Sequence, residues 1–163
     1  VFNNNLKKID TELEKIFLYC VKEKLINLNT VHHVAGNPKV DSIFDLTEAI
    51  GKKSIDSSLS KMENLLSHGA KALPTLGMIA RQFRLIWQAK SLTKKRVPST
   101  EISSKIGVPP HFVGKIISQA GKFTTENLIY AFERLLQADV ELKSSARPPG
   151  LIMESLVIDL CLS

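Results

Sequence analysis

The chain has 163 residues, of which 44% are hydrophobic and 23% charged, and its formal net charge is +6. This length fits one ordinary domain, or one domain plus part of a neighbour, and suffices to bury a core without disulfides. No apolar run reaches the roughly 18 residues of a membrane span and no signal peptide is evident, so we expect a soluble, intracellular protein with no membrane contact. The two cysteines, Cys20 and Cys161, lie far apart outside any metal-binding spacing and are expected to be reduced thiols.

Two helical segments are expected before residue 38. The first carries apolar residues at steps of three and four, and a short second helix is expected over 30–35. Gly36-Asn37-Pro38 then breaks the chain. Because this part is too small to be a domain by itself, we expect it to be the end of a domain whose beginning lies upstream. The apolar stripe of the first segment is Leu6, Ile9, Leu13, Ile16, Phe17 and Cys20.

Two further helices are expected over 42–51 and 54–67. Asp41 or Ser42 is the expected cap of the first, and His68-Gly69 is a typical end for the second. The apolar residues predicted to face inward are Ile43, Phe44, Leu46 and Ile50, followed by Ile55, Leu59, Met62, Leu65 and Leu66.

The stretch 74–90 predicts the central helix of the domain, ending near Leu92. Pro74 suits the first turn, where its missing N–H has no helical partner. Lys94-Lys95-Arg96 is expected to open a loop that reaches Pro98. The inward stripe is Leu73, Leu76, Ile79, Ala80, Phe83, Ile86 and Trp87, and its aromatic members are interpreted as core packing. Arg81, Arg84 and Gln88 fall together on another face.

Four more helices are expected to complete the chain: one that Ser99 caps and that runs to Ile106, one over 112–120, one that Thr124 or Thr125 caps, and one after residue 150. No run alternates between apolar and polar residues as a hairpin strand would. The sequence therefore predicts an all-α fold, a helical bundle of about nine helical segments with short connections. The last two helices are predicted to bury Leu128, Ala131, Phe132, Leu135, Leu136 and Leu142, then Met153, Leu156, Val157, Leu160 and Cys161.

No motif of enzyme chemistry is present. The sequence has neither a phosphate-binding glycine loop nor a dinucleotide fingerprint, and no serine or cysteine stands in a nucleophile motif. His32 and His33 are adjacent and point apart on a helix, so they cannot share a metal, and His68 is interpreted as a helix-end residue. We therefore assign no catalytic, cofactor-binding or metal-binding residue.

Positive charge is concentrated in the middle of the chain. Residues 71–122 hold ten lysines and arginines against one acidic residue, Glu101, whereas the remainder is mildly acidic. Such a segment is typical of a surface near nucleic acid or an acidic partner, and a merely solvated lysine-rich surface is the alternative.

Residues 99–122 also allow a helix–turn–helix interpretation, with Gly107 at the turn. A DNA-reading unit needs polar side chains on an exposed second helix. The candidates there are His111, Lys115, Ser118, Gln119 and Lys122. Two prolines in the turn favour a basic hairpin used for packing, so a free-standing helix–turn–helix DNA-binding protein is the second hypothesis. The positions expected to be buried in either case are Ile102, Ile106, Val108, Val113 and Ile116.

Several segments, in order, resemble the delta subunit of bacterial DNA polymerase III. LKKIDTELEKIFLYC is similar to a helix near the end of its lid module, and SIFDLTEAIGKKS with LGMIARQFRLIWQAKSL is similar to the start and central helix of its C-terminal collar domain. EISSKIGVPPHFVGKIISQAGKFTTENLIYAFERLLQADVELKS continues the collar, and LIMESLVIDLCL is similar to its closing helix. The resemblance implies that residues 1–38 are the end of a truncated AAA+ lid-like domain and residues 39–163 a helical collar domain.

The resemblance also implies a non-catalytic role in DNA replication in the bacterial cytoplasm. The delta subunit belongs to the clamp loader, which places the sliding clamp on primed DNA. Its collar packs against those of sister subunits, delta-prime and gamma or tau, and holds the pentamer together. Clamp binding belongs to an N-terminal module outside this chain and ATP hydrolysis to sister subunits, so no cofactor is expected. The parent protein is an accessory subunit of the DNA polymerase III holoenzyme. The holoenzyme is a DNA-directed DNA polymerase, which is a nucleotidyltransferase.

A collar also needs a positive face on the side of the DNA. We predict that this face makes non-specific phosphate contacts with primer-template DNA. Its predicted members are Arg81, Arg84, Lys90, Lys94, Lys95 and Arg96. Solvated basic residues without a ligand are the alternative for each.

Overall fold

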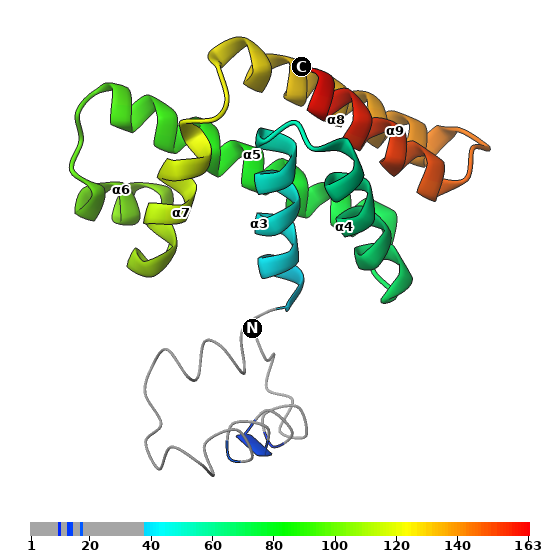
Figure 1. Cartoon of the computed structure of the whole chain (residues 1–163), viewed down its shortest axis with the longest axis horizontal. Helices are drawn as coiled ribbons and strands as arrows, with labels where there is room; N and C mark the ends of the chain where they lie inside the picture. Colours follow the sequence, from blue (N-terminus) through cyan, green and yellow to red (C-terminus); the bar gives the residue numbers. More distant parts are fainter. Residues whose placement is uncertain (1–9, 11–12, 15–16, 18–37) are drawn as a thin grey trace. The chain divides into compact units, whose positions relative to one another are not determined.

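A computed structural model describes residues 10, 13, 14, 17 and 38–163, and it shows seven helices and no strand among them (Figure 1). This confirms the all-α prediction for the described part of the chain. The first two predicted segments lie outside it, apart from four residues of the first, all helical: Asp10, Leu13, Glu14 and Phe17. Residues 42–163 form one compact unit. The helices are α3 (Pro38–Gly51), α4 (Ile55–Ser67), α5 (Ala72–Lys94), α6 (Ser99–Ile106), α7 (Pro110–Ala120), α8 (Thr125–Ser144) and α9 (Pro149–Leu162).

Helix α5 is the central rod of this unit, as its pattern predicts. It contacts α6, α7, α8 and α9, while α9 also contacts α4 and α8 (Figure 1). Phe83 and Ile86 of α5 are fully buried, and the Phe83 ring meets Phe123 edge-on at 5.4 Å between ring centroids. Burial of the predicted apolar positions therefore holds the helices together, and a large side chain such as Phe83 contributes about 3–5 kcal/mol when it is compared with alanine.

Four helices end on a residue in the left-handed conformation. Gly69 and Gly107, with φ of +78° and +67°, follow α4 and α6. Lys53 and Arg96, with φ of +57° and +58°, follow α3 and α5. After each of these four residues, the N–H of the following residue donates a hydrogen bond to the carbonyl oxygen five positions earlier, for example from Val97 to Leu92 at 3.1 Å. This bond satisfies a carbonyl group that the end of the helix leaves unpaired.

Four helices begin earlier than predicted, at or just after a proline: α3, α6, α7 and α9, the last of which begins at Pro149 rather than after residue 150. α3 begins at Pro38 rather than after a cap at Asp41 or Ser42, and α7 begins at Pro110 rather than Phe112. Pro98 occupies the cap position of α6, where Ser99 was expected. Proline fits the start of a helix because its fixed φ is already helical and its missing N–H leaves no donor unpaired.

Two leucines predicted to be inside lie outside. Leu73, in the first turn of α5, is 42% exposed, and Leu136 of α8 is 66% exposed. Leu136 follows the buried Leu135, and one residue step turns a helix by about 100°, which is enough to move the side chain out of the core. The predicted core residues of α9 are all buried. Both exposed leucines reappear below as part of a candidate binding surface.

Candidate interaction surfaces

The predicted basic residues lie along α5 and in the turn that follows it. Five of the six side chains are exposed. The sixth, Lys90, is partly buried, and its Nζ donates to the carbonyl oxygen of Ala120 at 3.4 Å. The exposed ones are Arg81, Arg84, Lys94, Lys95 and Arg96.

These six residues do not form one patch, because α5 divides them. Arg81, Arg84 and Lys95 lie on one side of the helix by their spacing, whereas Lys90 and Lys94 lie on another. The pKa of Glu126, at the start of α8, is lowered by its own backbone N–H and the Thr124 hydroxyl and, to a smaller extent, by the charges of Lys90 and Lys94. Lys90 and Lys94 therefore lie beside the start of α8.

Lys90 and Lys94 line a surface hollow of about 160 Å³, which we call the Trp87 pocket. Trp87 was predicted to be a core residue, yet it is only partly buried and forms one wall of this pocket. Its indole ring meets the Phe132 ring edge-on, with 5.9 Å between ring centroids, which helps to fix its orientation. The lining residues are Trp87, Lys90, Ser91 and Lys94 from α5 and Thr125 and Leu128 from α8.

A larger hollow of about 320 Å³, the α5–α8 groove, lies between the first half of α5 and the part of α8 from Phe132 to Lys143. The exposed Leu73 and Leu136 both line it, with Phe132 and Leu135 beside them. At its end, Lys143 Nζ forms an ion pair with Asp139 Oδ2 at 2.6 Å. The groove is therefore mainly apolar with a charged rim.

The outward side of α8 is also apolar. Ile129, Leu136 and Val140 lie seven and then four residues apart, which places them on one side of the helix, and they are 48%, 66% and 55% exposed. Together with Leu73 they form a surface that we call the apolar face of α8. The exposed Glu133 lies between Ile129 and Leu136 on this side of the helix. Several exposed apolar side chains on one side of a helix mark binding surfaces more often than single exposed residues do.

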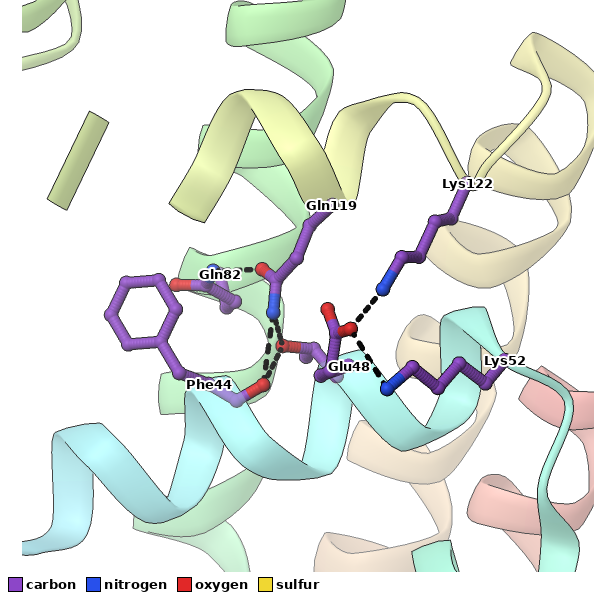
Figure 2. Close-up of polar contacts among 7 residues, drawn as sticks. Phe44, Glu48, Lys52, Gln82, Gln119 and Lys122 are labelled. Carbon is purple, nitrogen blue, oxygen red and sulfur yellow. Dashed lines mark hydrogen bonds and ion pairs between the residues drawn. The ribbon is translucent and has the colours of Figure 1, made fainter. Parts of the chain in front are cut away.

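A buried amide network joins three helices, α3, α5 and α7 (Figure 2). Gln82 of α5 donates from Nε2 to Oε1 of Gln119 of α7 at 2.7 Å. Gln119 in turn donates from Nε2 to the carbonyl oxygen of Phe44 at 2.9 Å and to the hydroxyl of Thr47 at 3.1 Å, both in α3. Because Gln82 and Gln119 are only 4% and 3% exposed, these bonds satisfy amides that have no access to water.

An ion-pair cluster lies beside this network. Lys122, after α7, and Lys52, after α3, both contact the Glu48 carboxylate, Lys52 at 3.3 Å (Figure 2). The hydrogen bond from Lys122, assisted by Lys52, lowers the pKa of Glu48 below its ordinary value of 4.5, against a smaller opposing effect of burial. Lys122 therefore serves as a link to α3, with its charge paired.

Comparison with known proteins identifies the family. A model of the family described as DNA polymerase III delta subunit, C-terminal domain, matches residues 40–160. The chain belongs to this delta-subunit family. It is 27% identical over 158 residues to the DNA polymerase III subunit delta of Bacillus subtilis (strain 168), covering 97% of this chain and 46% of that protein. It is 21% identical over 136 residues to the probable DNA polymerase III subunit delta of Aquifex aeolicus (strain VF5), covering 80% and 39%.

The delta-family chain also matches a solved structure. It superposes on the Bacillus subtilis DNA clamp loader delta protein (YqeN) with a TM-score of 0.78 and 26% identity, covering 97% of this chain and 47% of that one. The all-helical fold thus agrees with a clamp-loader delta protein. The chain spans about half the length, or less, of the relatives it matches.

The helix–turn–helix hypothesis finds no support in this delta-family structure. The expected apolar positions of α6 and α7 are buried, as either interpretation predicts. However, Gln119 was wrongly placed on the exposed side of the second helix, since it lies in the amide network, and Lys122 is paired with Glu48. The exposed polar residues left on α7 are His111, Lys115 and Ser118.

His68 and Cys161, in the described part of the delta-family chain, make contacts that support the fold. Within residues 38–163, and the four described before them, no cluster of three His, Cys, Asp or Glu side chains is suited to bind a metal ion. None of the helices in this part of the chain has the length and hydropathy of a membrane-spanning segment. His68 caps α4, with Nδ1 2.7 Å from the carbonyl oxygen of Asn64, as its position predicted. Cys161 is buried, with Sγ 3.5 Å from the Ser58 hydroxyl.

Proposed function

We propose that this chain is the assembly part of a clamp-loader delta subunit. In this proposal residues 39–163 are a collar domain that binds the delta-prime and gamma or tau subunits, and residues 1–38 are the end of an AAA+ lid domain. The chain has no catalytic role; it serves DNA replication in the bacterial cytoplasm as part of an accessory subunit of the DNA polymerase III holoenzyme. The sliding clamp is bound by another part of the parent protein.

The observation that carries the proposal is the apolar face of α8 in a chain of the delta family. Each of Ile129, Leu136 and Val140 keeps about half or more of its surface exposed. Burial of this exposed surface by a partner contributes about 1 kcal/mol of binding free energy for each side chain, since full burial of such a residue is worth roughly 1.5–3 kcal/mol. An apolar centre with a charged rim, such as Asp139 with Lys143, is the usual composition of a protein interface.

The occupant that fits this face is an apolar helix of a sister subunit. The adjoining α5–α8 groove runs between two helices, and a third helix can place its side chains between theirs by ridges-into-grooves packing. A face of this kind binds by burial rather than by charge, so its partner needs a complementary apolar stripe.

The test is complex formation with purified collar domains of the sister subunits, measured as mass by light scattering after size exclusion. We expect a heteromeric complex that Leu136→Asp abolishes, because the variant buries a charge in the contact. Leu162→Asp is the matched control, because Leu162 of α9 is 69% exposed and lies outside the apolar face. A heteromer that is equally sensitive to both variants, or no heteromer with the unaltered chain, contradicts the proposal.

The second part of the proposal is non-specific binding of primer-template DNA through the six basic residues of α5 and its following turn, which offer phosphate contacts on two separate sides of the helix. Phosphate contacts release counterions, so affinity should fall by at least about tenfold between roughly 50 and 200 mM salt and should not depend on sequence. Fluorescence anisotropy with random duplexes of different sequence measures both properties. Affinity for one particular sequence well above the others would instead favour the helix–turn–helix hypothesis.

A further inference from the structure

We propose that the Trp87 pocket binds one nucleotide of single-stranded DNA, with the base stacked on the Trp87 indole and the phosphate held between Lys90 and Lys94. This proposal rests on one part of the proposed function, namely that DNA binds near α5. It adds a site with its own ligand class, since phosphate contacts alone would not distinguish a single strand from a duplex.

The phosphate part of the site follows from the residues on one side of α5. Lys90 and Lys94 are one helical turn apart and line the same pocket, together with the hydroxyl-bearing Ser91 and Thr125. Lysine ammonium groups and the hydroxyl groups of serine and threonine are among the side-chain donors that contact DNA phosphates. Within the described part of the chain neither lysine forms an ion pair, and the bond from Lys90 to Ala120 is long at 3.4 Å.

Glu126 bears directly on the charge of this site. It lies close enough to Lys90 and Lys94 for their charges to lower its pKa. Two ammonium groups against one carboxylate still leave the pocket with positive charge, and Glu126 weakens its attraction for a phosphate. Removal of the Glu126 charge should therefore strengthen binding, a gain that only a ligand near this pocket would show.

The base-stacking part follows from Trp87. Indole rings bind bases by stacking, and the energy involved varies little with the identity of the base. In a duplex the bases already stack on their neighbours, so only a single strand can offer a free face to Trp87. The hollow of about 160 Å³ is lined by Leu128 as well, and it leaves room for a single base at most.

Trp87 is also the reporter, because it is the only tryptophan of the 163 residues. The first experiment titrates the whole chain at low salt with an oligothymidylate of about twelve nucleotides and, separately, with an abasic oligonucleotide of equal length and charge. We expect the thymidylate to quench the tryptophan fluorescence and to bind at least about tenfold more tightly than the abasic strand, whose binding leaves the fluorescence unchanged.

The second experiment measures the affinity of fluorescein-labelled oligothymidylate by anisotropy for variants whose circular dichroism matches that of the unaltered chain. Lys90→Gln with Lys94→Gln should weaken binding at least about tenfold. Lys71→Gln with Lys115→Gln is the matched control, since it removes the same charge from two exposed lysines outside the six basic residues and should weaken binding much less. Glu126→Gln should strengthen binding a few-fold, and Trp87→Phe should weaken it.

Each outcome separates this site from the proposed function. Binding without quenching, or equal losses from the two double variants, overturns the pocket while leaving the non-specific phosphate surface intact. No binding of the oligothymidylate overturns it as well. Quenching with the expected variant pattern, in a chain that forms no heteromer with sister collars, supports the pocket and contradicts the proposed assembly role.

Discussion

The buried amide network makes the sharpest prediction about stability. Gln119→Met keeps the length of the side chain but removes three hydrogen bonds, to Gln82, Phe44 and Thr47. It leaves the Gln82 amide donor without an acceptor in a site that is only 4% exposed. Loss of ordinary hydrogen bonds costs about 1 kcal/mol each, and a stranded buried donor costs about 1–3 kcal/mol, so we expect a loss of about 3 kcal/mol or more in the free energy of unfolding.

The double variant tests the cause. With Gln82→Met and Gln119→Met together no amide is stranded, and the Phe44 carbonyl still accepts from the Thr47 hydroxyl at 3.0 Å. The double variant should therefore be at least about 1 kcal/mol more stable than the sum of the single effects predicts. Urea denaturation followed by Trp87 fluorescence measures all four proteins. Additivity within about 0.5 kcal/mol would show that the two amides do not depend on one another.

Three further predictions concern turns, caps and charge. Gly107→Ala should cost about 1–2 kcal/mol because φ is +67°, whereas Gly114→Ala, within α7, should stabilise by about 0.5–1 kcal/mol; equal effects in urea denaturation would contradict this. Thr124→Ala should lower the thermal midpoint, since it removes the 3.1 Å cap bond from the first turn of α8 and costs about 1 kcal/mol. The unaltered chain should have a higher free energy of unfolding than Glu48→Gln above pH 4.5, and the difference should disappear as the pH falls through the lowered pKa of Glu48. A difference that stays the same in acid would contradict this prediction.

Much of the helical framework could be predicted from sequence because it depends on local signals. Apolar spacing identified the central helix and its buried Phe83, and His68-Gly69 marked the end of α4. These features need only a few consecutive residues to form. Lys53 and Arg96 were not predicted as left-handed caps, since glycine is the usual signal for that conformation and neither residue carries it.

The candidate surfaces could be predicted only in part, because they depend on contacts between distant residues. Gln82 and Gln119 are 37 positions apart, and a glutamine is expected at the surface unless its buried partner is known. Leu136 looks like a core leucine by spacing, since nothing local distinguishes the edge of the core from a partner-binding face. Trp87 and Lys90 were identified individually, but their shared pocket depends on the start of α8.

The central claim is that an apolar surface, rather than a charged one, joins this domain to its partners. Its most direct test is calorimetric titration of the chain with sister collar domains at several temperatures and salt concentrations. Burial of the apolar face of α8 predicts a negative heat-capacity change and an affinity that varies only a few-fold between roughly 50 and 300 mM salt. A heat-capacity change near zero with an affinity that falls at least about tenfold over that range would contradict the claim.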